Sequence, residues 1–398
     1  MLDGLLIRAS GALVGSYVVL YALEFGATSS QIGLMSTVAS LAGVMALLPG
    51  AQLAEGWMDP RRVVLVFSRG IRALIWVLFS LLSFFLAGQP AVYGILLLRA
   101  MRSFTGNAGS SAWTFLSSQI VPRRMRGKYF AARNMAKRVA ALLLVPAAGW
   151  LIDYLGFPVG YQVCFGLAAF VGALSYWAYS RIPFSPSERR IQTREEEGDD
   201  QMWSSASERR NFWAYCVTSA VWRFSSRFPG PFLSVYLVKV LGANAGIIGV
   251  MSAANNLTAL PGQALFGRWL DRRGMKWTLK LSGLLIPFLR WGWLLMSGPW
   301  GALPIKIGAG FLGAGYGLSR FNMLLAVTPE LHRARQIALY RTIRRSAAAV
   351  APLLGGLLVD RIGFLPVFAI SGCGRMLSTL LMMRFVREPH PEDSEMSQ

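Results

Sequence analysis

The ten residues GRWLDRRGMK, from Gly267 to Lys276, decide the fold of this chain. They join two long apolar runs, at about 245–267 and 277–297, and they place four basic residues around a single carboxylate. A carboxylate at a helix end accepts hydrogen bonds from a facing helix N-terminus and from neighbouring Arg side chains. We therefore interpret this stretch as a polar loop between two membrane-crossing helices, with Asp271 available to bind another helix.

A weaker copy of this loop occurs in the first half of the chain, where Asp59 corresponds to Asp271 at an offset of 212 residues. The same register matches Leu48, Pro49, Gly50, Leu53, Trp57 and Arg61 with Leu260, Pro261, Gly262, Leu265, Trp269 and Arg273. A second register, at an offset of 207 residues, matches Pro122, Arg126, Gly149, Asp153 and Gly156 with Pro329, Arg333, Gly356, Asp360 and Gly363. Because polar positions repeat as well as apolar ones, the chain consists of two related halves, as in transporters built from parallel repeats.

The composition is that of an integral membrane protein. Of the 398 residues, 54% are hydrophobic and only 15% are charged, and the mean hydropathy is +0.45. Soluble domains have about 25% charged residues, and disordered chains are polar and poor in aromatic residues. Twelve apolar runs are long enough to cross a bilayer. They cover about 4–25, 31–54, 63–87, 91–120, 134–153, 160–181, 212–240, 245–267, 277–297, 301–327, 337–359 and 364–386.

Positive charge is concentrated in one set of loops. There are 40 Lys and Arg against 19 Asp and Glu, which gives a formal net charge of +21. Much of the excess lies at Arg61, Arg62, Arg123, Arg124, Arg126, Lys128, Arg272, Arg273, Lys276, Arg333 and Arg335. By the positive-inside rule these loops face the cytoplasm. We therefore expect a multi-pass protein of the cell inner (plasma) membrane with both termini in the cytoplasm.

Together, the loop, the repeat and the twelve runs resemble the major facilitator superfamily. GRWLDRRGMK is similar to the family motif G-x-x-x-D-R-x-G-[RK]-[RK] and lies where the family carries its second copy, while Glu55 and Pro60 interrupt the first copy. The resemblance implies an all-α integral membrane fold with twelve transmembrane helices, arranged as two pseudo-symmetric six-helix bundles. We expect an N-terminal bundle at 1–181, a cytoplasmic linker at 182–211, a C-terminal bundle at 212–386 and a cytoplasmic tail at 387–398.

Several cations lie inside the predicted spans, whereas all 19 acids lie in loops, tails or span ends. A cation in the membrane is costly unless it is paired or faces water, and such residues are functional by default. By resemblance to the superfamily, the first and fourth spans of each half line the cavity. These spans contain Arg8, Arg99, Arg102, Arg223, Arg227, Lys306 and Arg320. We predict that Arg102, Arg223 and Arg227, nearest the membrane midplane, hold an anion.

Other residues complete the predicted site and its gate. Trp113, Trp222, Asn255 and Asn256 are candidates for the cavity wall. Three further cations, Arg72, Arg290 and Arg375, lie in spans that the resemblance places on the outside, so we expect structural roles for them, such as snorkelling. A cytoplasmic gate is predicted at Asp59, Asp271, Arg272, Arg273 and Gly274.

Two glycine-containing motifs indicate helix packing. Pro146–Gly149 and Pro352–Gly356 resemble the superfamily's fifth-helix motif and, because both halves contain it, indicate a hinge and close packing. Gly308–Gly313 matches G-x-G-x-x-G, but no strand precedes it, so the context for dinucleotide binding is missing. The sequence shows no catalytic triad, metal cluster or phosphate loop. We therefore expect no enzymatic activity, no cofactor and no bound metal.

These observations predict a secondary active transporter that moves a small organic solute, an anion on the strength of the unpaired cations, by alternating access. Since no acid lies mid-membrane, exchange, as in an antiporter, or facilitated movement is favoured over proton coupling. The expected partners are the small-molecule substrate and the lipid bilayer, without nucleic acid, and the expected state is a monomer. Two alternatives remain: multidrug-type efflux of amphipathic compounds, and a non-transporting receptor or scaffold that uses the central linker.

Overall fold

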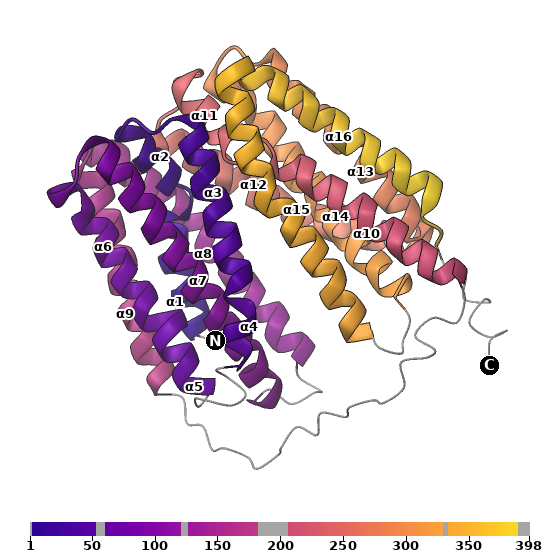
Figure 1. Cartoon of the computed structure of the whole chain (residues 1–398), viewed down its shortest axis with the longest axis horizontal. Helices are drawn as coiled ribbons and strands as arrows, with labels where there is room; N and C mark the ends of the chain where they lie inside the picture. The colour runs from indigo at the N-terminus through magenta and orange to yellow at the C-terminus, as the bar shows by residue number, and fades with distance from the viewer. Residues whose placement is uncertain (1, 53–59, 121–125, 182–205, 329–332, 389–398) are drawn as a thin grey trace.

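The computed structural model describes residues 2–52, 60–120, 126–181, 206–328 and 333–388, and it contains no strand within them. Helices satisfy their backbone hydrogen bonds internally, which apolar segments in lipid require. The helices form two bundles, one from each half of the chain (Figure 1). The predicted all-α fold with two bundles is confirmed. The predicted domain boundaries stay predictions, and α10 begins inside the predicted linker, at Ala206.

Six membrane crossings make up the N-terminal bundle, several of them built from adjoining helices. Its elements are α1 (Leu2–Gly15), α2 (Val18–Glu24), α3 (Ser29–Met45), α4 (Leu47–Gln52), α5 (Pro60–Val63), the π-helix η2 (Val64–Gly70), α6 (Ile71–Phe85), α7 (Gly88–Ile120), α8 (Arg126–Leu155) and α9 (Val159–Ser180).

The C-terminal bundle repeats this arrangement. Its elements are α10 (Ala206–Arg227), α11 (Phe232–Lys239), α12 (Ala245–Arg273), α13 (Met275–Trp291), the short 3-10 helices η4 (Gly292–Leu295) and η5 (Pro299–Gly301), α14 (Ala302–Ala326), α15 (Arg333–Ile362) and α16 (Phe364–Phe385).

Six segments of the described chain are long and apolar enough, taken alone, to cross a membrane: Gly4–Glu24, Arg61–Phe85, Arg138–Leu155, Val159–Ser180, Gln336–Ile362 and Phe364–Phe385. Helices α7, α10 and α14 have 33, 22 and 25 residues, so their length suffices. They fall outside this set because of their polar and charged residues. These are the helices that carry most of the predicted site.

The first crossing of each half is interrupted. Helix α1 ends at Gly15 and α2 begins at Val18, while Pro229, Gly230 and Pro231 separate α10 from α11. Proline removes a backbone donor and blocks a continuous helix, which accounts for the second break. Interrupted helices at the interface between repeats are typical of transporter binding sites.

The two bundles meet at one end and diverge toward the other (Figure 1). We call these the closed end and the open end. At the closed end α3 packs on α15 and α8 packs on α12. A Cβ atom at Gly33 would lie 2.5 Å from the Pro352 carbonyl oxygen, and one at Gly249 would lie 2.8 Å from the Pro146 Cα. The close packing predicted for the two Pro/Gly motifs is confirmed, whereas the hinge stays a prediction.

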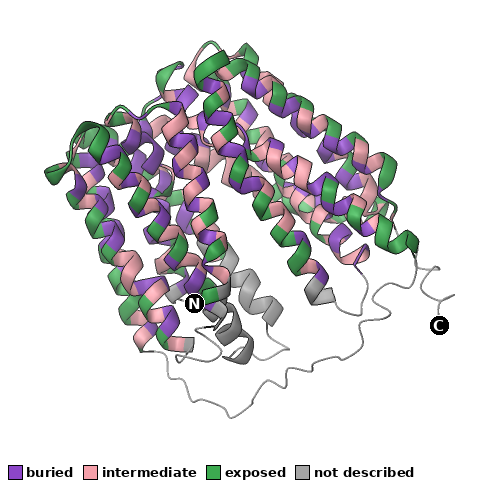
Figure 2. Cartoon of the chain, in the orientation of Figure 1, coloured by how far each residue is buried: buried purple, intermediate pink, exposed green. Residues whose placement is uncertain are grey.

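Exposed residues lie along the outer faces of the bundles (Figure 2), and many of them are large and apolar. On α6, Leu74, Leu78 and Leu81 are exposed, while Trp76 and Phe79 of the same helix are fully buried against Phe165. One face of α6 is therefore in the bundle core, and the opposite face is apolar but unpacked. Such a surface suits lipid and not water.

Candidate functional site

A cavity of about 680 Å³, here called the central cavity, lies between the two bundles. Its wall includes side chains from the first interrupted helix of the N-terminal bundle, from α12 and from α14. The charged part of the wall consists entirely of cations: Arg8, Arg72, Arg102, Arg290, Lys306 and Arg375.

Two smaller cavities share residues with each other or with the central one. A second cavity of about 490 Å³ shares Arg72 and Arg102 with the central cavity and adds Arg99 and Arg227. A third cavity of about 230 Å³ contains Arg223 and Arg227. No Asp or Glu is among the described residues that line these three cavities. The result is an acid-free interior with a strongly positive wall.

The structure brings together most of the predicted site residues, but not in one place. Arg8, Arg102, Trp222, Asn255, Asn256 and Lys306 line the central cavity. Arg102 and Arg227 share the second cavity, which also contains Arg99, while Arg223 reaches only the third. The predicted trio of Arg102, Arg223 and Arg227 therefore does not converge on one cavity.

Two predicted site residues lie elsewhere. Trp113 packs against the cluster formed by Val63, Val64 and Tyr179. Arg320 lines none of the three cavities, and its main-chain carbonyl accepts a hydrogen bond of 2.6 Å from the Tyr215 hydroxyl. Both helices reach beyond the cavities, so a residue on a cavity-lining helix need not face the cavity.

The outside position expected for Arg72, Arg290 and Arg375 was wrong, because all three line the central cavity. Their structural role stays a prediction. An Arg side chain is long enough to reach inward from an outer helix. Arg72 does so beside Gly11, where a Cβ atom would lie 2.7 Å from its Nη2 atom. One feature of the sequence did indicate this inward position. The predicted spans contain no mid-membrane acid to pair with these cations, and an unpaired cation in a bundle faces water or a ligand.

Aromatic rings support several of these cations. Arg102 lies 4.8 Å from the centroid of Trp76, Lys306 lies 5.7 Å from that of Trp293, and Arg375 lies 5.6 Å from that of Trp222. A ring face attracts a cation but does not satisfy its N–H donors. Within the described part of the chain, the buried Nε atoms of Arg72 and Arg375 have no hydrogen-bond partner. The two buried Nε donors are therefore unsatisfied, and no carboxylate is among the described residues that line the cavity beside them.

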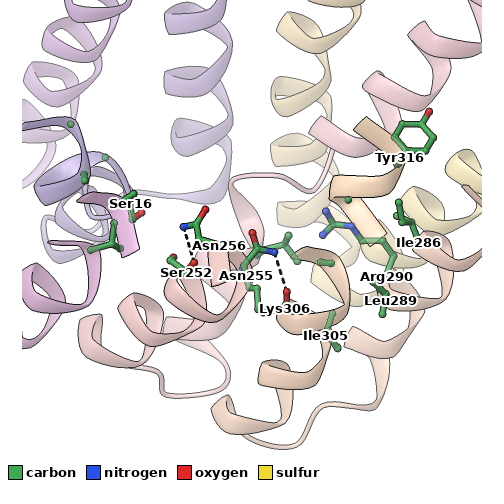
Figure 3. Close-up of a pocket in the computed structure, with 18 of the residues that line it drawn as sticks. Ser16, Ser252, Asn255, Asn256, Ile286, Leu289, Arg290, Ile305, Lys306 and Tyr316 are labelled. Atoms are coloured by element: carbon green, nitrogen blue, oxygen red, sulfur yellow. Dashed lines mark hydrogen bonds between the residues drawn. The ribbon is translucent and has the colours of Figure 1, made fainter. Parts of the chain in front are cut away.

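Neutral polar side chains also line the central cavity, among them Ser16, Ser252, Asn255 and Asn256 (Figure 3). The Asn255 amide nitrogen donates to the Lys306 carbonyl at 3.0 Å, and the Asn256 amide nitrogen donates to the Ser252 carbonyl at 2.9 Å. These bonds leave each amide oxygen available as an acceptor. Arg290 reaches in from the side that also carries Tyr316 (Figure 3), whose ring stacks on Trp222 with centroids 4.2 Å apart.

The family model of the Major Facilitator Superfamily matches residues 4–318 and, in a second match, 216–397. The two matches together extend over nearly the whole chain. The chain belongs to the major facilitator superfamily. The cation-lined cavity of this superfamily member lies between its two repeated halves.

Relatives within the superfamily match part of the chain. The "Multi-drug resistance efflux pump PmrA homolog" of Lactococcus lactis subsp. lactis (strain IL1403) is 28% identical over 162 residues, which is 40% of this chain and 40% of that protein. The "Multidrug resistance protein MdtG" of Dickeya zeae (strain Ech586) is 29% identical over 163 residues, again 40% of each chain. Each match thus spans about two-fifths of the relative's length.

Solved structures of superfamily transporters share the fold over almost the full length. A D-xylose–proton symporter superposes with a TM-score of 0.76 at 16% identity, covering 97% of this chain and 96% of the symporter. A bacterial homologue of the iron transporter ferroportin, in an inward-facing state, has a TM-score of 0.75 at 16% identity and covers 96% and 97%. At this identity the likeness concerns the fold alone.

At the closed end, this superfamily member has two carboxylates that bridge the bundles. Asp153, at the end of α8, accepts hydrogen bonds from the backbone N–H groups of Ala245 and Gly246 at 2.9 and 2.7 Å. Asp360, at the end of α15, accepts one from the Ser30 backbone at 2.9 Å and another from the Ser30 hydroxyl. In both contacts the donating N–H groups belong to the first turn of a helix in the opposite bundle. The N-terminal end of a helix dipole favours a negative charge, so it stabilises each carboxylate. We call the two contacts the closed-end latches.

The sequence repeat pairs Asp153 with Asp360, so the two latches are related by the symmetry of the superfamily fold. The pairing is visible in the sequence, but the role of the two carboxylates is not. Spacing alone does not reveal which helix end a carboxylate will meet, because that depends on how the bundles pack.

The gate predicted from the superfamily motif lies at the open end. There Asp271, Arg272 and Arg273 are exposed, and Arg273 lies 4.6 Å from the centroid of Trp277. Gly274 adopts a φ of 83°, and the backbone N–H groups of Met275 and Lys276 donate to Glu388 at 3.0 and 3.3 Å. These contacts stay within the C-terminal bundle. Asp59, like Arg123 and Arg124, lies outside the described residues, and the gating role stays a prediction.

Proposed function

We propose that this protein is a monomeric secondary transporter of the inner (plasma) membrane that moves a small organic anion by alternating access. One observation carries the proposal: six cations and no described carboxylate line the central cavity. Cations within a membrane protein need a counter-charge, a carbonyl or water. An anionic solute supplies that counter-charge, whereas a cationic solute would meet repulsion from every charged group on the wall.

The arrangement of the bundles supports a conformation open to the cytoplasm. Arg61 lies in α5, Arg272 and Arg273 end α12, and Arg333 begins α15, so all four lie at the open end. By the positive-inside rule this end faces the cytoplasm, as do both termini. The closed end then faces outward. Alternating access requires the closed end to open and the open end to close around the same cavity.

Efflux of amphipathic compounds is the second candidate. It is favoured by the printed names of the partial relatives, two of which are multidrug resistance proteins. The stacked pair of Trp222 and Tyr316 gives the cavity an aromatic surface. The six cations argue against cationic drugs as the main cargo, so this candidate is restricted to neutral or anionic amphiphiles.

Counterflow in proteoliposomes tests the proposal. We expect vesicles preloaded with an organic anion to accumulate the labelled anion, with equal pH on both sides, because no acid is found among the described cavity residues. Matched neutral and cationic solutes, and an amphipathic dye, serve as comparisons. Accumulation of the dye or of a cation, without any anion, would favour efflux over the proposed function. Loss of all counterflow in protein of verified fold would favour the receptor or scaffold.

The closed-end latches predict a shift in conformation when their charge is removed. Asp153→Asn and Asp360→Asn keep the shape but lose charge-assisted hydrogen bonds, each worth about 1.5–3 kcal/mol. We expect either change to open the closed end in a fraction of molecules, and the double variant to do so in most. The measurement is the distance between spin labels at Tyr154 and Val240, which are exposed on opposite bundles at this end, with the three native cysteines replaced.

Glu24→Gln is the matched control for the latches. Glu24 is an exposed acid at the end of α2, at the same end of the molecule. Its neutralisation should leave the label distance unchanged. Equal distance distributions in the wild type and in the double latch variant would show that the carboxylates do not hold this end closed.

A further inference from the structure

The six cations of the central cavity form two groups on opposite walls. The N-terminal bundle contributes one group, Arg8, Arg72 and Arg102, from α1, α6 and α7. The C-terminal bundle contributes the other, Arg290, Lys306 and Arg375, from α13, α14 and α16. Because each bundle supplies three, the positive charge is divided across the cavity and is not gathered at one point.

Both groups are built into the packing of their own bundle. In the N-terminal bundle, Arg72 occupies space that a side chain at Gly11 would fill, and Arg102 lies over Trp76. In the C-terminal bundle, Arg375 is only 7% exposed and Lys306 lies over Trp293. Each bundle therefore holds its cations in place without a carboxylate among the described lining residues, and each group requires its own counter-charge.

Two neutral amides also line the cavity, Asn255 and Asn256. Each amide nitrogen donates one N–H group to a main-chain carbonyl (Figure 3) and keeps its second N–H group and the amide oxygen for a ligand. These amides can bind a neutral polar part of a solute, whereas each cation group supplies the positive charge that binds an anionic group. Negative charge is thus favoured beside each of the two cation groups.

We infer that the cargo carries anionic groups at both ends, as an α,ω-dicarboxylate or an α,ω-bisphosphonate does. A cargo with one anionic group compensates one cation group and leaves the other exposed to the cavity. A two-ended anion compensates both and thereby connects the two bundles through itself. The cavity volume of about 680 Å³ falls within the range of small-molecule sites. This inference rests on the proposed function, because it names the class of anion that the same site would take.

Competition for counterflow by two series of probes tests the inference. One series consists of α,ω-dicarboxylates from succinate to suberate and the corresponding bisphosphonates, and the other consists of monocarboxylates and monophosphonates of equal length. In the wild type we expect the best two-ended probe to compete at least about ten-fold better than its one-ended counterpart. The variants are Arg72→Gln and Arg290→Gln, one from each group.

In either variant, the advantage of the two-ended probe over the one-ended probe should shrink, because one cation group has lost one of its three charges and the hydrogen bonds of that side chain. Arg384→Gln is the control: it removes an exposed cation from the last turn of α16 and should leave the ten-fold preference unchanged. Far-ultraviolet circular dichroism and elution volume in detergent verify folding of each variant.

The outcomes separate the inference from the function on which it rests. Equal competition by one-ended and two-ended probes in the wild type would overturn the inference and leave the transport of anions standing. A preference of unchanged size in both the Arg72 and the Arg290 variants would also overturn it, because the preference would then arise elsewhere. Absence of competition by every anion, with counterflow of a neutral solute intact, would overturn the proposed function itself.

Discussion

Replacement of Arg102 by Gln is expected to lower the rate of anion counterflow by roughly 10- to 100-fold, since a hydrogen bond to a charged group contributes about 1.5–3 kcal/mol and about 1.4 kcal/mol corresponds to a factor of ten. Arg102 lines both the central and the second cavity, so an anion that passes between them meets it in each. Initial rates of labelled-anion counterflow at several concentrations are the measurement.

The same substitution should not unfold the protein. Arg72 and Arg99 lie within electrostatic reach of Arg102, so neutralising Arg102 relieves repulsion between like charges. The loss of its cation–π contact with Trp76, worth about 0.5–2 kcal/mol, acts in the opposite direction. We therefore expect a melting temperature near that of the wild type. A rate loss accompanied by normal melting identifies a transport defect.

Two further variants serve as controls for the Arg102→Gln experiment. Arg102→Lys keeps the charge but lacks the planar fork that binds a carboxylate or phosphate with two parallel hydrogen bonds, so it should transport at an intermediate rate. Arg384→Gln, which removes a cation far from the cavity wall, should transport normally. If Arg102→Gln moved anions as fast as the wild type, the positive cavity would not be the anion site.

The twelve crossings could be predicted from the sequence because each lies on a long run rich in apolar residues, even where polar and charged residues interrupt the run, as in α7, α10 and α14. The interruption between α10 and α11 was also visible in principle, at Pro229 and Pro231. The interruption between α1 and α2 was not, because no proline marks it. There the Tyr17 hydroxyl donates to the Val145 carbonyl at 2.5 Å. This is a tertiary contact, and no local sequence pattern predicts it.

The direction in which each cation points could not be predicted. In a soluble protein, the polar face of a helix marks its outer side, but here both the lipid and the bundle core are apolar. Helix rotation is then set by close packing, as at Gly11, which makes room for Arg72. Arg320 and Trp113 were misplaced for the same reason. The absence of membrane acids was the part of the pattern that did carry information, because it does not depend on rotation.

A single added side chain at the closed end is expected to abolish most transport. Gly33 and Gly249 occupy matching places in the two halves, within the similar stretches Ile32–Ser36 and Ile248–Ser252. Each faces only the opposite bundle at its closest approach. A Cβ at Gly33 would lie 2.5 Å from the Pro352 carbonyl oxygen, and one at Gly249 would lie 2.8 Å from the Pro146 Cα and 2.9 Å from the Tyr17 hydroxyl. Backbone atoms cannot move aside as a flexible side chain can, so a larger residue requires the two bundles to separate.

Gly33→Val and Gly249→Val should therefore hold the closed end apart. Overpacking of this kind costs about 1–3 kcal/mol, which shifts the equilibrium between the two conformations by roughly 10- to 100-fold. We expect a longer distance between spin labels at Tyr154 and Val240 and a comparable fall in counterflow. Binding of an anion should persist, because neither glycine lines the three cavities. This combination separates a conformational block from damage to the site.

Gly317→Val supplies the control, because a Cβ at Gly317 would meet no atom within 4 Å. It introduces the same β-branched residue into a helix and carries the same cost in helix propensity, but without the steric clash. It should transport like the wild type and show the original label distance. If Gly33→Val kept both the short distance and the full rate, closure at this end would tolerate a side chain between the bundles. The transport cycle would then not depend on the glycine contact of α3 with α15, and the site of closure would have to lie elsewhere along the two bundles.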